Sequence, residues 1–419
     1  MHTPLANNIR GLFVTSDENL SSGETGQTMP NFDAIRTSAG QQGVLPSIDE
    51  SLAHRAGDVK VSIIIPVYNT SEYLHQCLDS AVNQTLKEIE IIVIDDASTD
   101  NSLAIIRQYE RQDGRIRVIA FEENRGNGFG RNEATRQATG IYLMFLDSDD
   151  WLETNAAEMM YGKAVAHHHD IVMYGYTWHL ANIQNEKKNK KVYLPLLEDN
   201  DPNFFRYMVQ QRKGLSCMPW QFIFEKEFVI RNSICFPNDI YFEDVPFSIK
   251  AIYKAKNIGV LRSSLYNYRQ RNTSITESVS KKKITDMLVS LVMVKKFLDE
   301  ENIFIQYQRE YLLRFLMHGI CYVFMNYFRL SKQEKDEELD RYMEKLRTSS
   351  FMRTENLLFV LQAIAELDAD EVHAKESYQR TYNTLYSLIY SYKILRFNCS
   401  VAYFIRDIIE TKFRFFSTT

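Results

Sequence analysis

The sequence predicts an α/β fold with a Rossmann-like, mostly parallel mixed sheet, followed by an α-helical C-terminal domain. From Val59 onward, short runs rich in isoleucine and valine alternate with stretches of helical periodicity, which is typical of a doubly wound sheet. From Lys281 the strand signals stop and long helical patterns take over. We therefore expect a flexible polar extension over residues 1–57, an α/β domain over 58–278 and a helical domain over 279–419.

The expected elements of the α/β domain follow from local patterns. Apolar runs predict strands at residues 61–66, 90–95, 116–121, 141–146 and 170–175. Ser71 is the expected cap of a first helix, whose apolar positions are Leu74, Cys77, Leu78, Ala81 and Val82. Asp100 or Asn101 is the expected cap of the next helix. The lysine-rich residues 182–191 predict an exposed loop or hairpin turn.

Composition excludes several classes of protein. The net charge of -5 gives no general attraction to nucleic acid, so no nucleic-acid partner is expected. Five scattered cysteines lack the short spacings of zinc sites or disulfide frameworks, and they indicate buried thiols in a reducing compartment. Residues 1–57 lack the pattern of a signal peptide. The apolar window 312–330 contains Arg314, His318 and Asn326, which favours a buried helix over a membrane span. We expect a cytoplasmic protein.

Carboxylates follow the apolar runs where the predicted strands end. Asp147, Asp149 and Asp150 come directly after the run 141–146, and Asp95-Asp96 follows Ile91-Ile92-Val93-Ile94. Open α/β sheets gather ligands at the carboxyl ends of their strands. Such a cluster repels itself without a cation, so these residues predict a site for a metal-bound, phosphate-bearing substrate. The competing interpretation is an acidic helix cap before Trp151.

Four features make this prediction more specific. Asp149 is the candidate ligand of a divalent ion, Mn²⁺ or Mg²⁺, which neutralises a pyrophosphate leaving group. Asp147 either points to the same side or is splayed toward a ribose hydroxyl. Asp96 is a candidate acceptor of hydrogen bonds from a base or ribose, although turn chemistry also explains the segment 95–100. The loop 124–132 carries glycines and two arginines, which suit either phosphate binding or a flexible turn.

These motifs resemble glycosyltransferase family 2. The resemblance rests on order and spacing and covers roughly residues 59–276. Its segments are Val61 to Asn69, Asp95 to Asp100, Arg131-Asn132, Asp147-Ser148-Asp149-Asp150, Phe242-Glu243-Asp244-Val245-Pro246-Phe247 and Tyr266-Asn267-Tyr268-Arg269-Gln270-Arg271. The chain departs from the family pattern at Met218-Pro219-Trp220-Gln221-Phe222, where many members have Asn-Lys.

The resemblance implies a GT-A fold and inverting transfer of a sugar from a nucleoside diphosphate sugar, with UDP as the default nucleotide. It places the nucleotide at Pro66, Tyr68, Asn69, Asp96, Arg131, Asp147, Arg269 and Arg271, and the metal at Asp149. Asp244 becomes the general base and Glu243 orients or binds the acceptor. We expect the Asp244 carboxylate to keep its reference pKa of about 4 and to be ionised at neutral pH. The competing interpretation of Glu243-Asp244 is a helix start.

Other functions remain open at this point. An Asp-dependent phosphotransferase would use Asp147 as nucleophile, but Trp151 stands where that class has Thr or Val. A non-catalytic nucleotide-binding scaffold of a polysaccharide machine is a third interpretation. His179 is either a metal ligand or structural, and His167-His168-His169 are expected to form a solvated helix end.

The segment 381–419 has ten aromatic residues and a local charge of +3. It suits peripheral contact with the inner face of the cell membrane, a partner helix, or helical core packing. A glycan or lipid-linked acceptor in surface polysaccharide synthesis would fit a membrane contact. The sequence leaves open whether the chain forms a homo-oligomer.

Overall fold

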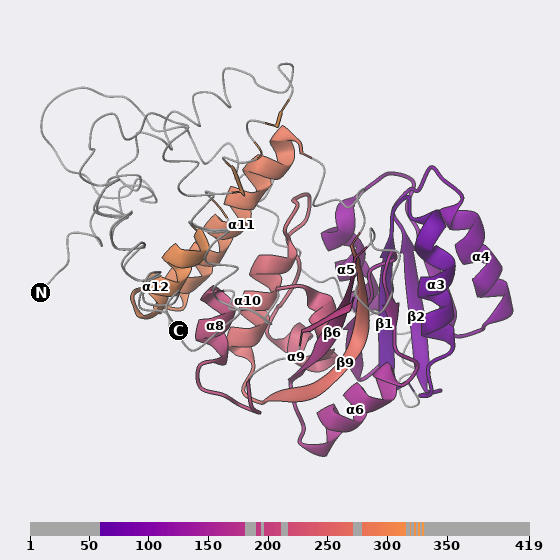
Figure 1. Cartoon of the computed structure of the whole chain (residues 1–419), viewed down its shortest axis with the longest axis horizontal. Coiled ribbons are helices and arrows are strands. Elements are labelled where there is room, and N and C mark those ends of the chain that lie inside the picture. Colours follow the sequence, from indigo (N-terminus) through magenta and orange to yellow (C-terminus); the bar gives the residue numbers. More distant parts are fainter. Residues whose placement is uncertain are drawn as a thin grey trace, which may run out of the picture. The chain divides into compact units, whose positions relative to one another are not determined.

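The computed structural model describes a large part of the chain, drawn in colour in Figure 1. The described residues are 59–180, 190–193, 197–210, 217–270, 279–315, 319, 322–323, 326 and 329–330. The predicted extension over 1–57 and the segment 381–419 lie outside them. The chain divides into two compact units, one holding Gln27–Glu310 and the other Met1–Gly26 and Tyr311–Thr419. The sheet and every described site residue belong to the first unit.

Parallel strands form the first half of the sheet, in the order β3-β2-β1-β4. Every residue of β1 and β4 is buried, which explains why consecutive apolar residues make up these strands. The predicted strands in this part are confirmed to within one residue at each end. The strands are β1 (Val61–Val67), β2 (Ile89–Asp95), β3 (Ile116–Ala120) and β4 (Tyr142–Phe145).

The second half makes the sheet mixed, and the predicted α/β class with a mostly parallel mixed sheet is confirmed. β8 (Phe222–Glu225) runs antiparallel to β4 and to β6 (Ile171–Leu180). β9 (Ile258–Gln270) runs parallel to β6 and antiparallel to β5 (Trp151–Leu152). β7 (Lys190–Tyr193) pairs antiparallel with β6, in agreement with the hairpin interpretation of residues 182–191. The strand predicted at 170–175 is β6, which continues to Leu180.

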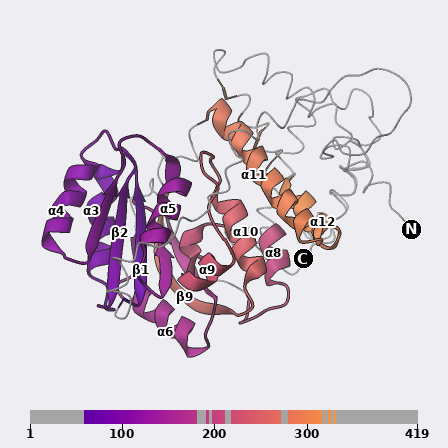
Figure 2. The same cartoon turned by 180° about the vertical axis from the view of Figure 1, so that it is seen from behind.

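Helices cover the sheet, and α3 and α4 lie side by side along its first half (Figure 1). In the second half of the fold, α10 packs against α8 and α11, as the reverse view also shows (Figure 2). The described helices are α3 (Ser71–Val82), α4 (Ser102–Gln112), α5 (Gly126–Gln137), α6 (Ala156–Ala166), α8 (Phe204–Gln210), the 3-10 helix η2 (Pro219–Gln221), α9 (Lys226–Arg231), α10 (Asp244–Lys254), α11 (Lys281–Glu300) and α12 (Phe304–Arg314).

One carboxylate begins both α3 and α4. Asp100 accepts hydrogen bonds from the backbone N–H of Ser71 (3.0 Å) and of Ser102 (2.9 Å). Burial raises the pKa of Asp100, but these hydrogen bonds outweigh it and lower the pKa to about 2. Ser71 was predicted as the cap of α3, which was wrong: Thr70 occupies the N-cap position and Ser71 is the first helical residue. For α4, Asn101 occupies the N-cap position without a capping side-chain hydrogen bond, and Asp100 supplies the carboxylate that accepts from Ser102.

A cluster of phenylalanines fixes α10 on the sheet. The ring of Phe247 on α10 stacks on Phe236 with a centroid distance of 3.7 Å and meets Phe145 of β4 and Phe224 of β8 edge to face. All four side chains are buried. Aromatic pairs of this kind contribute roughly 0.5–1.5 kcal/mol beyond the area they bury. They therefore hold the N-terminus of α10 against the carboxyl end of β4.

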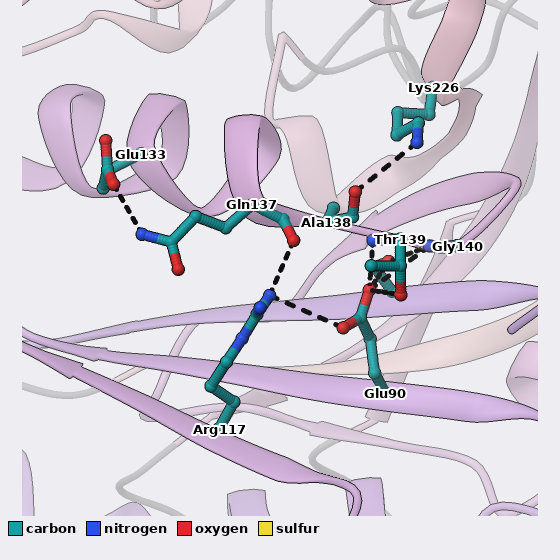
Figure 3. A network of polar contacts seen from close by, with 9 residues as sticks. Glu90, Arg117, Glu133, Gln137, Ala138, Thr139, Gly140 and Lys226 are labelled. Atoms are coloured by element: carbon teal, nitrogen blue, oxygen red, sulfur yellow. Dashed lines mark hydrogen bonds and ion pairs between the residues drawn. The ribbon is translucent and has the colours of Figure 1, made fainter. Parts of the chain in front are cut away.

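A polar network closes the amino end of the sheet (Figure 3). Glu90, at the start of β2, accepts hydrogen bonds from Ser62 Oγ (2.6 Å), Thr139 N–H (2.5 Å), Thr139 Oγ1 (2.9 Å) and Gly140 N–H (3.2 Å). Gly140 is required here, because a Cβ at this position would lie 2.6 Å from the backbone nitrogen of Ser62. Arg117 pairs with the other carboxylate oxygen at 3.5 Å. Glu90 thus ties the entry of β4 to β1 and β2.

The region after the sheet begins with α11, which lies in the same compact unit as the sheet. The predicted domain boundary at 278 therefore stays a prediction about sequence composition. Among the described residues, no helix is long and apolar enough to cross a membrane. Cys77 and Cys217 are buried and Cys235 is partly buried, and all three are free thiols, as expected.

Candidate active site

The carboxyl ends of β1 and β2 are locked together by Asn69. Its side-chain oxygen accepts hydrogen bonds from the backbone N–H of Thr99 (2.7 Å) and Asp100 (3.3 Å), and its own N–H donates to Ser98 Oγ (3.1 Å). Asn69 has a φ of 52°, in the left-handed region that asparagine tolerates better than most residues. The neighbouring Tyr68 is 42% exposed. Asn69 therefore joins the segments that follow β1 and β2, and Tyr68 is exposed beside it.

Asp96 organises the glycine-rich loop from inside the protein. Its two carboxylate oxygens accept hydrogen bonds from the backbone N–H of Arg125 (2.7 Å) and of Gly126 (2.8 Å), at the start of α5. Burial raises the pKa of Asp96, although these hydrogen bonds act in the opposite direction. The loop amides expected to meet phosphate thus donate to Asp96 in the described structure. The role of Asp96 in holding the nucleotide remains a prediction.

Gly128 brings α5 close to the segment before α10. A Cβ at Gly128 would lie 2.3 Å from the carbonyl oxygen of Pro237 and 3.3 Å from the Cγ of Glu243. Asn132 adds to this contact, because its side chain donates to the carbonyl of Phe236 (2.8 Å) and accepts from its N–H (2.9 Å). The close approach that Gly128 allows is therefore between α5 and the segment before α10.

Arg131 joins two carboxylates that are far apart in the sequence. Its Nη1 donates to Glu243 Oε1 at 2.6 Å, and its Nη2 donates to Asp147 Oδ1 at 2.9 Å. The residue is only 4% exposed, and its guanidinium lies 5.4 Å from the centre of the Phe236 ring. Burial lowers the pKa of Arg131, but the charges of Asp147, Glu243 and Asp244 outweigh it and raise the pKa. Arg131, Asp147, Glu243 and Asp244 therefore form one electrostatic unit.

Glu243 and Asp244 begin α10, as the helix-start interpretation expected, but neither acts only as a cap. Glu243 is the N-cap residue without a capping side-chain hydrogen bond, and its carboxylate faces Arg131 instead. Burial raises the pKa of Asp244 to about 7, with Glu243 adding to the rise and Arg131 opposing it. The expectation of a pKa near 4 was wrong, because the folded chain places this partly buried carboxyl beside a second acid.

Asp147, Asp149 and Asp150 divide between surface and interior. Asp147 has a side chain that is 29% exposed, and Asp149 is also partly exposed. Asp150 is 1% exposed and accepts hydrogen bonds from Tyr266 Oη (2.7 Å) and from the backbone N–H of Arg269 (2.7 Å). The acidic-cap interpretation was wrong, because Trp151–Leu152 forms β5 and Asn155 is the N-cap of α6.

Sequence reasoning counted Asp150 among the carboxylates of the expected metal site and gave Tyr266 no role of its own, whereas the structure joins the two side chains. Tyr266 Oη also accepts a hydrogen bond from the backbone N–H of Asp147 (3.1 Å), so Tyr266 and Asp150 attach β9 to the turn 147–150. Burial, with the charges of Asp149 and Asp147, raises the pKa of Asp150 well above its ordinary value. No local pattern indicates this pair, because Asp150 and Tyr266 are 116 positions apart in the sequence.

Arg269 closes one side of the site. Its Nε donates to the backbone carbonyl of Asp149 at 2.9 Å, and it also donates to the side chain of Gln76. The guanidinium lies 4.8 Å from the centre of the Trp151 ring and 5.1 Å from that of Tyr73. Arg269 is thus held at the edge of the carboxylate cluster. Arg271, the second predicted arginine, lies outside the described residues.

The donor set at the strand ends suits a hard divalent ion. Within the part of the chain that the structure describes, no group of three or more His, Cys, Asp or Glu side chains is arranged to hold a metal. Mg²⁺ and Mn²⁺ commonly take one or two carboxylates and complete their shell with substrate phosphates and water. Asp149, with Asp147 two residues before it, fits that pattern.

The histidines serve the fold. His179 Nε2 lies 2.8 Å from Asn267 Oδ1, and its ring packs on Trp151 with a centroid distance of 4.5 Å, which supports the structural interpretation. His169 was expected at a solvated helix end and is instead 2% exposed, with Nδ1 2.9 Å from Asn257 Oδ1. His167 and His168 are exposed.

The chain is similar to known glycosyltransferases. A family model described as glycosyl transferase family 2 matches residues 62–232. Cholesterol galactosyltransferase of Borreliella burgdorferi is 30% identical over 310 residues, which cover 71% of this chain and 83% of that protein. The uncharacterized glycosyltransferase EpsJ of Bacillus subtilis is 33% identical over 224 residues, 52% of this chain and 63% of EpsJ. Poly(ribitol-phosphate) beta-glucosyltransferase of Bacillus spizizenii is 35% identical over 214 residues, 50% of this chain and 32% of that protein.

The chain thus spans less than two thirds of EpsJ and a smaller share of the Bacillus spizizenii enzyme, whereas it covers most of the Borreliella burgdorferi enzyme. The family model spans the strand-end carboxylates and Arg131, and the similarity to the Borreliella burgdorferi enzyme covers 71% of this chain. On these grounds the chain belongs to glycosyltransferase family 2.

Proposed function

We propose that this protein transfers a sugar from a nucleoside diphosphate sugar, with UDP-sugars as the first candidates, to a hydroxyl of a glycan or lipid-linked acceptor. The transfer inverts the anomeric carbon in a single displacement. The observation that carries the proposal is the buried ion-paired unit of Arg131, Asp147 and Glu243, because it joins the strand-end carboxylates to the acid pair of α10. A donor-binding edge and a proton acceptor therefore face one site.

Asp244 is the base in this reaction. The acceptor hydroxyl attacks the anomeric carbon, its proton passes to Asp244, and the bond between that carbon and the diphosphate oxygen breaks. A carboxyl with a pKa of about 7 is suited to the step, since general-base catalysis is most effective when the pKa lies near the working pH. Glu243, held by Arg131 next to Asp244, orients the acceptor.

The leaving diphosphate carries the charge that must be neutralised. A divalent ion held by Asp149 would supply that neutralisation as a Lewis acid. Arg269 lies next to the backbone of Asp149 and adds a fixed positive charge. In this proposal Asp147 binds the ribose, and Pro66, Tyr68 and Asp96, at the neighbouring strand ends, bind the base.

The acceptor class rests on the relatives. One relative is a cholesterol galactosyltransferase and another a poly(ribitol-phosphate) glucosyltransferase, so both sterol and polymer hydroxyls occur among the acceptors of similar proteins. We place the reaction in surface polysaccharide synthesis. Contact of residues 381–419 with an anionic membrane surface, a cytoplasmic location and a homo-oligomeric state remain predictions.

A donor panel tests the proposal. Release of nucleoside diphosphate from UDP-, GDP- and dTDP-sugars is measured with and without Mn²⁺, in wild type and in Asp149→Ala. We expect one donor class to be turned over, Mn²⁺ to stimulate turnover, and Asp149→Ala to lose the Mn²⁺-dependent part of donor binding by calorimetry. Turnover that is insensitive to chelation and to Asp149→Ala would remove the metal role, and no turnover of any donor would favour the scaffold interpretation.

A further inference from the structure

The turn that leads into Glu243 has a backbone that its residues do not prefer. Asp239 and Phe242 have φ values of 60° and 64°, in the left-handed region. For a bulky residue such as Phe242 this conformation is unfavourable, and it persists only where the surrounding structure enforces it. Since Phe242 directly precedes Glu243 and Asp244, whatever enforces its conformation also sets the direction of the two carboxylates.

Helix α11 supplies the enforcing contacts. Asp286 Oδ2 accepts a hydrogen bond from the backbone N–H of Tyr241 at 2.9 Å, and Ser290 Oγ donates to the backbone carbonyl of Phe242 at 2.9 Å. Lys282 donates through its Nζ to the backbone carbonyl of Asp239. Asp286 is 6% exposed and Ser290 is fully buried, so water does not compete for these hydrogen bonds.

The three side chains lie on one stripe of α11. Lys282, Asp286 and Ser290 are spaced four residues apart, which places them one above the other on the same helical face. Lys282 and Asp286 also pair with each other at 2.6 Å. The Tyr241 ring lies 5.4 Å from Lys282 Nζ. The stripe therefore contacts the turn at three backbone groups, which belong to Asp239, Tyr241 and Phe242.

We propose that α11 is a positioning element of the active site, in which Asp286 and Ser290 hold the turn 239–242 so that Glu243 and Asp244 face the strand-end carboxylates. This inference rests on the proposed function, in which Asp244 is the base. It extends the active site to a helix beyond the residues 62–232 that the family model matches and beyond the predicted α/β domain.

Substitutions on the stripe test the proposal in the full chain. Ser290→Ala and Asp286→Ala each remove one tie, while Asp286→Asn keeps an acceptor oxygen for the Tyr241 N–H. Because a shift of about 1 Å in a catalytic group can slow a reaction by about 100-fold, we expect kcat to fall about 10- to 100-fold in the two alanine variants. The donor KM and donor affinity should not change. Asp286→Asn should recover most of the loss.

Matched controls come from the same helix. Asp299→Asn and Lys296→Ala change exposed charges of α11 whose ion pairs among the described residues are with Lys295 and Glu300 of the same helix, and they should behave as wild type. Melting temperatures and donor calorimetry confirm that each variant is folded. The pH–rate profile of Ser290→Ala should also shift its acidic limb, since Asp244 moves relative to Arg131 and Glu243.

The outcomes separate the two claims. If Asp244→Asn retains activity, the proposed base is wrong. If Asp244→Asn is inactive while Ser290→Ala and Asp286→Ala keep wild-type kcat, the base stands and the positioning role of α11 is overturned. A parallel loss of donor affinity and kcat in the alanine variants would also overturn it, because it would show a general loss of structure.

Discussion

The two ends of the same sheet treat carboxylates in opposite ways. At the amino end, Glu90 accepts four hydrogen bonds on one oxygen and meets Arg117 on the other (Figure 3). At the carboxyl end, Asp147 and Glu243 share the single guanidinium of Arg131, and the nearby Asp244 has its pKa raised to about 7. In the first arrangement, one carboxylate has hydrogen-bond donors and a cation as partners. In the second, three carboxyl groups surround one arginine, so negative charge exceeds positive charge.

The difference shows what each end is for. A buried charge that has all its partners ties elements together and is available to nothing else. An excess of acids beside one another is unfavourable in the free protein and becomes favourable when a cation or a proton arrives. The amino end therefore stabilises the fold, and the carboxyl end retains the capacity to bind and to accept a proton.

The largest expected effect is on the carboxyl end. Asp244→Asn should lower the transfer rate by roughly 10²–10⁴, because an amide of similar shape cannot accept the acceptor proton. Binding of the nucleotide, measured by calorimetry, should persist. The comparison breaks down if Asp244→Asn transfers sugar at the wild-type rate, and attention would then move to Glu243.

Arg131→Met addresses the shared guanidinium. Loss of this residue leaves Glu243 and Asp147 without their buried partner, which should lower the free energy of unfolding by about 3–5 kcal/mol. Denaturant unfolding measures the change. Arg136→Met, on the same helix and paired with Glu133 at a more exposed position, serves as the control and should lose about 0–1 kcal/mol. Equal losses of unfolding free energy in the two variants would show that the ion pairs of Arg131 stabilise the fold no more than an ordinary surface ion pair.

Glu90→Gln tests the stabilising role of the amino end of the sheet. The new amide group would face donors on Ser62, Thr139 and Gly140, so we expect a loss of about 1–3 kcal/mol in unfolding free energy. Sugar transfer by the remaining folded protein should equal that of wild type. A drop in kcat without a drop in stability would contradict the division of labour between the two ends.

The smallest expected effect is the dependence on pH. Burial beside Glu243 raises the pKa of Asp244 to about 7, and only the deprotonated form accepts a proton, so the rate should rise with pH through about 7 and level off above it. Each pH unit below that value should lower the rate about tenfold. Initial rates at saturating donor measure the profile, with binding of nucleotide as the control. A profile that stays flat through this region would exclude Asp244 as the titrating base.

The first half of the sheet, and the types of residue at its carboxyl end, could be predicted from the sequence alone. β1, β2, β3 and β4 were predicted to within a residue, because buried parallel strands are visible as local apolar runs. The second half was harder. β5 has only two residues, and β9 mixes polar and apolar residues without a continuous apolar run through the strand. The two strands pair with each other although they lie over a hundred residues apart in the sequence, so no local pattern indicates the pairing.

The contacts and the electrostatics of the site could not be predicted from the sequence, because they depend on the folded structure. Arg131 and Glu243 are separated by 112 positions, and no local pattern indicates that they meet. The pKa of Asp244 and the support of Phe242 by Ser290 likewise depend on burial and on contacts between distant segments. Local sequence encodes which side chain is present and where a strand ends, but charge coupling and desolvation depend on distances that exist only after the chain has folded.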